Sequence, residues 1–549
     1  MYSGVLLGYF GKQDEARKAF RQLWGMGYRR AAWVAKDADG DIHIWDPFPW
    51  RRGLGAILAF IVFGALASGV SFSLQWAGPA LWGYAPIPLL AGGLFGALLS
   101  FVWFRRSTFG VRRGLIEDHS RWLLSGESVL ILLAPIEVLQ EPVGVLLESG
   151  EIPPAVFVMY PKHDSPNGDD WSAGASNTPE QLQEHAERLA TIHTLDPGLP
   201  RNTELLSRIE QGRRWLHEAC LDLAVANRLE QSVSPAAEWL LDNEYVIEGT
   251  ARKVLLNLPR RYYRQLPALM NEPDRGFPRI YGLARELASA SDLRLDQVNI
   301  LAFIAAYQTE MPLSIGELWA VPQMLRTTLM EGIQQIAGRT QTELRERGTA
   351  NFWANRLIAV NRRDPQQIFS ILAELTQTQP SPSPYFASQL IDYLYDEESA
   401  LAPVQSWLER KFQKSLGDLS LQAKNRQTKD QISIGNAFTS LRGLDLLDWK
   451  VCFEQLSHVE SLLRQDPAGI YSQMDFNTRD RCRRSVENLH RGSGLAEDQI
   501  ARRVLDLARQ AVHDHVADEL SSHVGTSRRS ALPRRSHRGR RSHSSSRRG

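Results

Sequence analysis

The sequence predicts a mainly helical chain that starts with a small ferredoxin-like α+β domain interrupted by a two-helix transmembrane hairpin. Short apolar segments alternate with helical patterns up to residue 160. A run of 52 residues without charge, 53–104, interrupts them. Helical periodicity then continues from residue 178 to about residue 520. These observations predict the small domain, the hairpin and a large all-α region, followed by a disordered basic tail.

The first domain, residues 1–160, contains five predicted strands and the helices between them. The strands are short and apolar, and the turn residues at 37–40 separate the second from the third. Helices are indicated by apolar side chains spaced three or four residues apart, such as Ala16, Phe20 and Leu23. The predicted elements are strands 5–10, 31–35, 42–45, 129–133 and 155–159, and helices 14–24, 111–124 and 136–148.

The uncharged run 53–104 is long enough for two membrane-spanning helices, since one span needs about 20 residues. We expect the spans at 53–76 and 88–104, with the Gly- and Pro-containing turn 77–87 between them. Arginines flank both outer ends of the run, and the turn has no positive charge. The positive-inside rule then predicts a multi-pass protein of the bacterial inner (cytoplasmic) membrane with both termini cytoplasmic. The lipid bilayer is accordingly an expected partner.

Beyond the first domain, the chain reads as helices joined by short loops. Thr178, Pro179 and Gln181 have the pattern of a capping box at a helix start. Ser234 with Pro235 repeats the cap-plus-proline start and opens a predicted helix through about Leu256. The predicted domains are 1–160 with the hairpin 53–104, the linker 161–177, a helical hairpin 178–233, a helical region 234–525 and a disordered tail 526–549.

Charge is distributed unevenly along the chain. The tail 526–549 contains nine Arg and no acidic residue, which leaves residues 1–525 with a net charge of −8. The negative net charge of residues 1–525 argues against nucleic acid as a partner of this part of the chain. Two alternatives remain for the tail. It binds RNA or lipid, or it is a read-through or frameshifted end. The three cysteines are far apart and form no CxxC pair, which argues against a disulfide framework or a zinc site.

Several motifs in residues 234–525 resemble the N-terminal region of the cyclic β-1,2-glucan synthase family, large bacterial inner-membrane enzymes. The resemblance covers about 290 residues in the expected order. The motifs are PAAEWLLDN at 235–243, LPRRYYRQLP at 258–267, FPRIYGLA at 277–284, PLSIGELWA at 312–320, DPAGIY at 466–471, MDF at 474–476 and RDR at 479–481.

The resemblance implies a glycosyltransferase that uses UDP-glucose and a divalent metal in a domain that this chain lacks, so no cofactor is expected here. The chain is then expected to be the membrane-anchored N-terminal portion of a synthase, apparently truncated before the catalytic domains and not catalytic alone. The alternative is a non-enzymatic membrane scaffold whose helical module docks a partner, such as a downstream synthase polypeptide.

The best candidates for a ligand site are arginines and aromatic residues, because Arg pairs with phosphate and aromatic rings stack on sugar rings. In the alternative interpretation the aromatic side chains pack between helices and Arg–Glu pairs fix their ends. The candidates are Arg260, Arg261, Tyr262, Tyr263, Arg279, Tyr281, Glu317, Trp319 and Arg326. No metal site is expected: Asp37 and Asp39 fit a turn, and His513 and His515 point apart on a helix.

Overall fold

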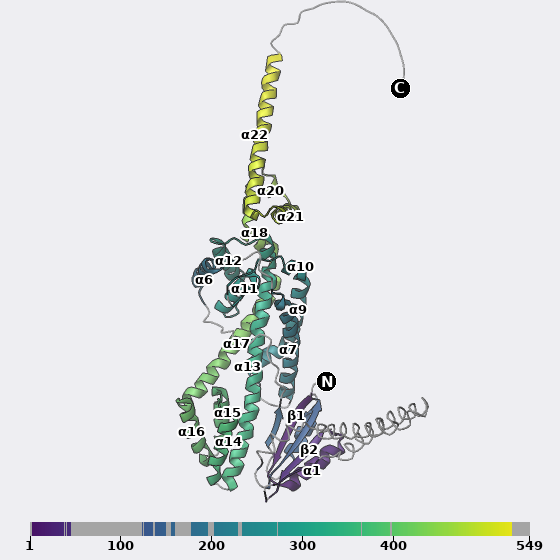
Figure 1. The fold of residues 1–549 in the computed structure, drawn as a ribbon, viewed down its shortest axis with the longest axis vertical. Coiled ribbons are helices and arrows are strands. Elements are labelled where there is room, and N and C mark those ends of the chain that lie inside the picture. Colours follow the sequence, from purple (N-terminus) through teal and green to yellow (C-terminus); the bar gives the residue numbers. More distant parts are fainter. Residues whose placement is uncertain are drawn as a thin grey trace, which may run out of the picture. The chain divides into compact units, whose positions relative to one another are not determined.

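The structure, a computed structural model (Figure 1), describes most of the chain outside the apolar run and the tail. The described residues are 3–37, 39, 41–45, 123, 126–135, 138–149, 155–159, 177–195, 202–228, 233–271, 273–363, 365–395 and 398–529. The chain divides into two compact units. The first unit comprises Met1–Ser172, Ser207–Arg252 and Leu329–Phe438, and the second comprises Ala173–Leu206, Lys253–Thr328 and Thr439–Gly549.

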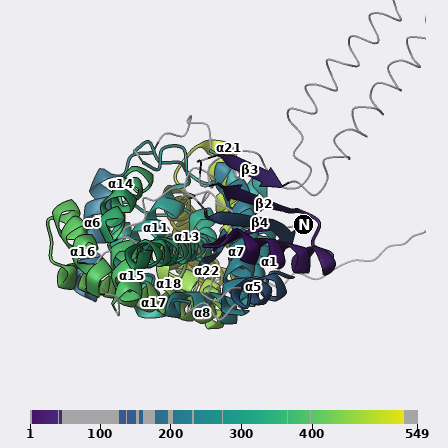
Figure 2. The ribbon, with the colours of Figure 1, turned by 90° about the horizontal axis from the view of Figure 1, so that it is seen from below.

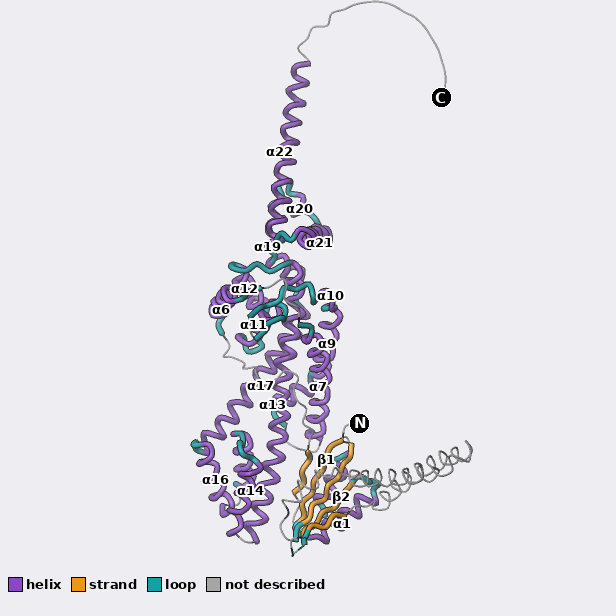
Figure 3. The backbone as a smooth tube through the Cα atoms, viewed as in Figure 1, coloured by secondary structure: helices purple, strands orange, loops and turns teal. Residues whose placement is uncertain are grey.

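A five-stranded antiparallel sheet lies in the first unit, drawn in orange in Figure 3. Its strand order is β3-β2-β4-β1-β5. The central pair β1 and β4 runs in register from Ser3 opposite Pro135 to Phe10 opposite Ser128. The strands are β1 (Ser3–Phe10), β2 (Ala31–Lys36), β3 (Ile42–Trp45), β4 (Ser128–Pro135) and β5 (Ala155–Met159). All five predicted strands therefore occur, within a few residues of their predicted bounds.

Both faces of the sheet are covered, which explains why consecutive strand residues such as Leu6 and Leu7 are both fully buried. Helices α1 (Gln13–Gly25) and α5 (Gln140–Leu147) lie on one side of the sheet (Figure 2). Gly8 faces α5 so closely that a Cβ atom there would lie 3.1 Å from Leu146. On the opposite side the ring of Tyr9 packs 4.7 Å from that of Phe352 in α13.

The helices of the first unit pack around their own apolar core. Trp353, Phe386 and Leu408 are among its fully buried members. Besides α1 and α5, the helices that lie wholly or partly in this unit are α7 (Glu204–Arg228), α8 (Pro235–Asp242), α9 (Glu244–Asn257), α13 (Ile315–Arg363), the 3₁₀ helix Pro365–Gln367, α14 (Ile368–Thr378), α15 (Pro384–Leu394), α16 (Glu398–Phe412) and α17 (Leu416–Leu446). Of these, α7, α9, α13 and α17 contribute residues to both units.

The helix predicted from residue 234 to about 256 is instead two helices, α8 and α9. Asn243 ends α8 with a non-helical backbone, φ −122° and ψ 15°. Its side-chain amide donates a hydrogen bond of 2.8 Å to the carbonyl of Trp239. This local bond competes with continuation of the helix, which is why Asn favours helix ends.

Most helices of the second unit are short, and several of them begin at a side-chain cap. At α6, Thr178 and Gln181 form the predicted capping box, with the proline in the first turn. Helix α12 packs against α6, and α22 packs against α19 and α21. The remaining helices are α6 (Pro179–Ile192), α10 (Arg260–Tyr263), α11 (Arg279–Ala290), α12 (Gln297–Gln308), α18 (Trp449–Leu456), α19 (His458–Leu463), α20 (Ile470–Gln473), α21 (Phe476–Ser493) and α22 (Glu497–Arg529).

The predicted transmembrane architecture requires correction. Among the described residues, no helix combines the length and the apolar character needed to cross a membrane. The long helices α13, α17 and α22 carry charged side chains along their length. The predictions of a multi-pass protein and of an inner-membrane location are therefore not upheld, and the structure shows a mainly helical chain with a small antiparallel sheet. The predicted hairpin, 53–104, lies outside the described residues, as do most of the predicted linker and tail.

Candidate ligand-binding site

A cavity of about 760 Å³ lies within the second unit. Residues of α9, α10, α13, α18 and α21 line it, so it draws on segments that are up to 238 positions apart in the sequence. We call it the aromatic pocket. Its lining residues are Lys253, Asn257, Tyr262, Ile315, Gly316, Trp319, Pro322, Gln323, Arg326, Trp449, Lys450, Phe476, Asn477, Asp480, Arg484, Glu487 and Arg491.

One wall of the aromatic pocket is a cluster of rings around Trp319. The indole of Trp319 stacks on Phe453, with centroids 4.7 Å apart and an interplanar angle of 14°. It also meets Phe476 edge to face at 6.3 Å and 88°. Offset stacking and edge-to-face contacts are the preferred geometries of aromatic pairs. The cluster therefore holds Trp319 and Phe476 in defined positions on the pocket wall.

Tyr262 ties the beginning of α13 to α10. Its hydroxyl donates a hydrogen bond of 2.5 Å to the carbonyl of Gly316, in the first turn of α13. Burial raises the pKa of Tyr262 above its usual value, and the nearby Glu487 and Glu317 add to this effect. Tyr262 is therefore a neutral hydroxyl at physiological pH, and it can order the pocket wall as a hydrogen-bond donor.

Arg326 and Lys253 share one carboxylate at the edge of the aromatic pocket. Arg326 Nη2 lies 3.0 Å from Asp445 Oδ1, and Lys253 Nζ lies 2.5 Å from Asp445 Oδ2. Arg326 is nearly buried and also donates to the carbonyls of Pro322 and Leu444. Burial would raise the pKa of Asp445, but the hydrogen bonds from Lys253 and Arg326 outweigh it and hold that pKa below its usual range.

Helix α21 presents one polar face to the aromatic pocket. Its lining residues Phe476, Asp480, Arg484, Glu487 and Arg491 recur at intervals of three or four, so they share one face. Asp480 pairs with Arg484 at 2.8 Å, and Glu487 pairs with Arg491 at 2.5 Å. Both carboxylates of this face are thus already bound by arginines of the same helix.

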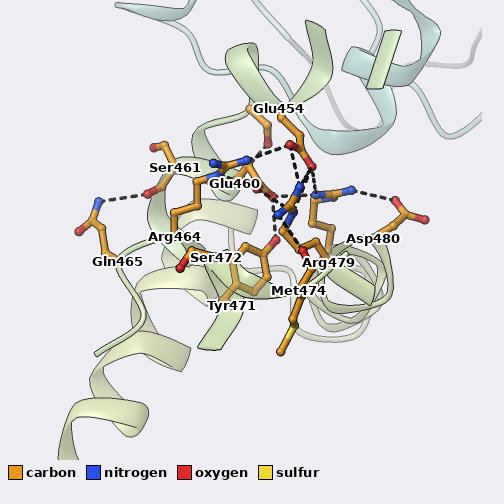
Figure 4. A network of polar contacts seen from close by, with 12 residues as sticks. Glu454, Glu460, Ser461, Arg464, Gln465, Tyr471, Ser472, Met474, Arg479 and Asp480 are labelled. Atoms are coloured by element: carbon orange, nitrogen blue, oxygen red, sulfur yellow. Dashed lines mark hydrogen bonds and ion pairs between the residues drawn. The ribbon is translucent and has the colours of Figure 1, made fainter. Parts of the chain in front are cut away.

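A buried ion pair contacts the ring cluster and belongs to a polar network around Glu454 and Glu460, which Figure 4 shows. Arg483 and Glu460 are both fully buried, and 2.7 Å separates Nη1 from Oε2. The guanidinium lies 4.7 Å from the ring centroid of Phe476 and 5.1 Å from that of Phe453. Tyr471 donates a hydrogen bond of 2.7 Å to the same Glu460 oxygen. Arg483 thereby joins a buried carboxylate to the rings of the pocket wall.

Two further arginines complete this network. Arg479 contacts both carboxylate oxygens of Glu454, at 2.9 and 3.0 Å from Nη2, and Arg464 bridges Glu454 and Glu460 at 2.8 Å each. Burial would raise the pKa of Glu460, but hydrogen bonds from Tyr471 and the arginines lower it overall. Glu460 is therefore charged, and the network supports the wall of the pocket.

Three of the nine predicted site residues, Tyr262, Trp319 and Arg326, line the aromatic pocket together. The pocket lining does not include the other six. These are Arg260, Arg261, Tyr263, Arg279, Tyr281 and Glu317. A role of the six in ligand binding stays a prediction, and the contacts of four of them favour the alternative interpretation in which they hold the fold: Arg279, Glu317, Tyr263 and Tyr281.

Arg279 and Glu317 illustrate that alternative. Arg279 Nε lies 2.7 Å and Nη2 2.5 Å from the two Glu317 oxygens, and both side chains are buried. Arg279 also donates to the carbonyl of Pro312 at 3.1 Å. Glu317 in turn accepts from the backbone and hydroxyl of Ser314. The bidentate pair therefore anchors the start of α13 to α11.

The remaining four predicted residues divide between interior and surface. Tyr263 is fully buried and donates a hydrogen bond of 2.6 Å to the carbonyl of Asn202. Tyr281 is buried and packs 5.5 Å from Phe277. Arg260 and Arg261 are exposed on α10.

The sequence interpretation missed the contributions of α18 and α21 to the pocket. Trp449 and Lys450 follow the helix-capping Asp448, and the residues of α21 recur with helical spacing from Phe476 onward. The spacing alone could have indicated a shared face on α21. It could not have shown that this face meets Trp319, which lies 157 positions earlier.

The described residues contain no group of three or more His, Cys, Asp and Glu side chains arranged to hold a metal ion. Asp37 accepts a hydrogen bond of 3.1 Å from Gln13 and lies 2.8 Å from His43, in keeping with its predicted place at the β2–β3 turn. The side chain of His515 lies outside the described residues.

Comparison with known proteins supports the family resemblance. No family model matches the chain. A stretch of 283 residues, 51% of the chain, is 32% identical to the cyclic beta-(1,2)-glucan synthase NdvB of Rhizobium meliloti (strain 1021). The match spans only 10% of that much longer protein. The predicted resemblance to the cyclic β-1,2-glucan synthase family is therefore confirmed over about half of this chain.

Proposed function

We propose that this chain takes part in glucan synthesis and that its second unit contributes a carbohydrate-binding pocket. The similarity to a glucan synthase supports the first part of the proposal. The ring cluster around Trp319, on the wall of a pocket of about 760 Å³, carries the second. Ligand pockets span about 300–1,000 Å³ and combine aromatic surface with a few placed polar groups.

The composition of the pocket suits a sugar. The rings of Trp319 and Phe476 offer flat apolar surface for the C–H faces of a pyranose. The side chains of Asn257, Gln323 and Asn477 also line the pocket and can both donate and accept hydrogen bonds with hydroxyl groups. The pocket can therefore contact both the apolar C–H groups and the hydroxyl groups of a sugar.

The pocket is proposed to bind and not to transfer glucose. Metal-assisted transfer needs carboxylates that are available to hold a cation against a diphosphate. The two carboxylates of the pocket, Asp480 and Glu487, are each paired with an arginine one helical turn away. Supplying the purified chain with labelled UDP-glucose should accordingly give no labelled glucan, and robust synthesis would contradict this part of the proposal.

Calorimetric titration with the β-1,2-linked disaccharide of glucose and longer oligomers tests the binding itself. We expect saturable binding that is lost when Trp319→Leu removes the stacking surface. Tyr395→Leu is the matched control, because Tyr395 is an exposed aromatic residue of the first unit, 74% exposed. Thermal unfolding shows whether each variant is folded. A folded wild-type chain that binds no glucose oligomer would refute the proposal.

A second candidate function, docking of another polypeptide, is favoured by one surface. Val504, Leu507 and Val512 on α22 are exposed by 40%, 54% and 39%, and they recur at helical spacing. Amphipathic helices bind partners through such apolar faces. Affinity purification of the tagged chain from its own cells should recover a glucan-synthesis protein, and Leu507→Glu should abolish the recovery while Arg509→Ala does not. A chain that purifies alone would count against docking.

A further inference from the structure

The aromatic pocket has more positive than negative charge. Its lining contains five basic and two acidic residues. The ion pairs Asp480–Arg484 and Glu487–Arg491 account for both acidic groups. The basic residues left over are Lys253, Arg326 and Lys450.

Among the described residues, one nearby carboxylate, that of Asp445, offsets these three cations. Asp445 is shared between Lys253 and Arg326, so it neutralises one positive charge of the two. Lys450 contacts no carboxylate at ion-pairing distance within the described part of the chain. Its Nζ lies 5.1 Å from the ring centroid of Phe476, beside the pocket wall. The pocket therefore retains about two unbalanced positive charges next to its aromatic surface.

The carboxylates behind the pocket do not cancel this excess. Glu317 is buried and bound by Arg279, and Glu497 accepts a hydrogen bond of 2.8 Å from the backbone N–H of Ile315 at the start of α13. Burial raises the pKa of Glu497, which disfavours its charged form. The network behind Phe476 contains Glu454 and Glu460, which are bound by three arginines.

We propose that the aromatic pocket binds a phosphorylated sugar, with the sugar ring on Trp319 and Phe476 and the phosphate near Lys450 and Lys253. This inference rests on the proposed function, the binding of carbohydrate in this pocket. A phosphate monoester carries a charge of about −1.5 to −2 at neutral pH, which matches the excess charge of the pocket. Lysine ammonium groups act as compact point charges in phosphate sites.

Matched ligands separate the contribution of the phosphate from that of the sugar. The full chain is titrated with glucose, glucose 6-phosphate, inorganic phosphate and the β-1,2-linked disaccharide of glucose, at low and high salt. We expect glucose 6-phosphate to bind about tenfold or more tightly than glucose, because a hydrogen bond to a charged group contributes enough free energy for such a gain in affinity. Its affinity should fall as salt rises, because Lys253 and Lys450 are exposed and salt screens their charges.

Single variants then locate the phosphate. Lys450→Met and Lys253→Met should each weaken glucose 6-phosphate binding several-fold, and each should reduce the affinity for the neutral disaccharide by a smaller factor. Lys411→Met, on the first unit, is the control and should change neither. Thermal unfolding of each variant shows that the fold is intact.

The outcomes distinguish the two proposals. If the disaccharide binds but glucose 6-phosphate binds no better than glucose, the pocket holds neutral sugar and the phosphate inference is overturned. If inorganic phosphate binds as tightly as glucose 6-phosphate, the pocket is a simple anion site and the inference is likewise overturned. If no sugar binds to the folded chain, the proposed function fails together with the inference.

Discussion

Arg483 and Glu460 form an ion pair in which neither side chain reaches solvent, with 2.7 Å between Nη1 and Oε2. The pair lies directly behind the pocket, because the same guanidinium packs on Phe476 and Phe453. Desolvating two charges is costly, and good geometry with further hydrogen bonds is needed to offset the cost. Tyr471 and Arg464 supply such bonds to Glu460. The arrangement links the stability of the second unit to the shape of the pocket wall.

Removing Arg483 should therefore strongly destabilise the second unit. Arg483→Met keeps much of the side-chain volume but leaves the buried Glu460 without its closest charge partner. Loss of one member of a buried pair costs about 3–5 kcal/mol. Urea unfolding measures this loss, and the exposed neighbour Arg481→Met should stay within about 0.5 kcal/mol of wild type. Equal stability of the two variants would show that the network contributes little.

The cap of α18 should control both stability and the pocket. Asp448 accepts hydrogen bonds from the backbone N–H groups of Lys450 and Val451, at 3.0 and 3.4 Å. Asp448→Ala removes this cap, which costs about 1 kcal/mol. Because Trp449 and Lys450 line the pocket, sugar binding should weaken as well. Calorimetric titration and thermal unfolding measure both effects, with Asp506→Ala on α22 as an exposed control.

A substitution in the Arg279–Glu317 pair tests whether Arg279, a predicted ligand-binding residue, has a structural role instead. Arg279→Lys keeps the positive charge but cannot reproduce the two-pronged contact with Glu317. We expect a loss of about 2 kcal/mol in unfolding free energy. The exposed Arg261→Lys should cause almost none. An Arg279→Lys variant with wild-type stability but impaired sugar binding would instead support the predicted role in ligand recognition.

The sequence was informative where a structure is decided locally. The strands of the first unit and the capping box at Thr178 follow from short-range patterns, because apolar alternation and cap chemistry act over a few residues. Tyr262, Trp319 and Arg326 were also predicted as site residues from their side-chain chemistry. Their common pocket could not be derived, since it depends on which distant helices pack together.

Two other features were not predicted. The polar face of α21 looks like an ordinary solvated surface in the sequence, because its Asp–Arg and Glu–Arg pairs have the spacing of exposed ion pairs. The break between α8 and α9 at Asn243 depends on one side-chain hydrogen bond that competes with helix continuation. Tertiary packing determines the role of the α21 face, whereas a side-chain bond between residues four positions apart determines the helix break at Asn243.

The stability of the first unit should fall as pH rises from about 4 to 7. Burial raises the pKa of Asp222 and of Glu343 to about 7 each. Gln341 donates a hydrogen bond to Asp222, and Gln427 donates one to Glu343. In this pH range the folded chain keeps protons that the unfolded chain has released, so unfolding free energy decreases with rising pH. Each group should lower the unfolding free energy by on the order of 3 kcal/mol, and this loss is complete above pH 7.

Asp222→Asn and Glu343→Gln isolate this effect. Each substitution removes one titrating group, so the variant should lose part of the pH dependence and become more stable than wild type at pH 8. Urea unfolding at pH 5 and pH 8, followed with a probe in the first unit, measures the difference. Asp418→Asn, at an exposed position on α17, serves as the control and should follow the wild-type profile. A wild-type chain that gains stability between pH 5 and pH 8 would contradict the prediction.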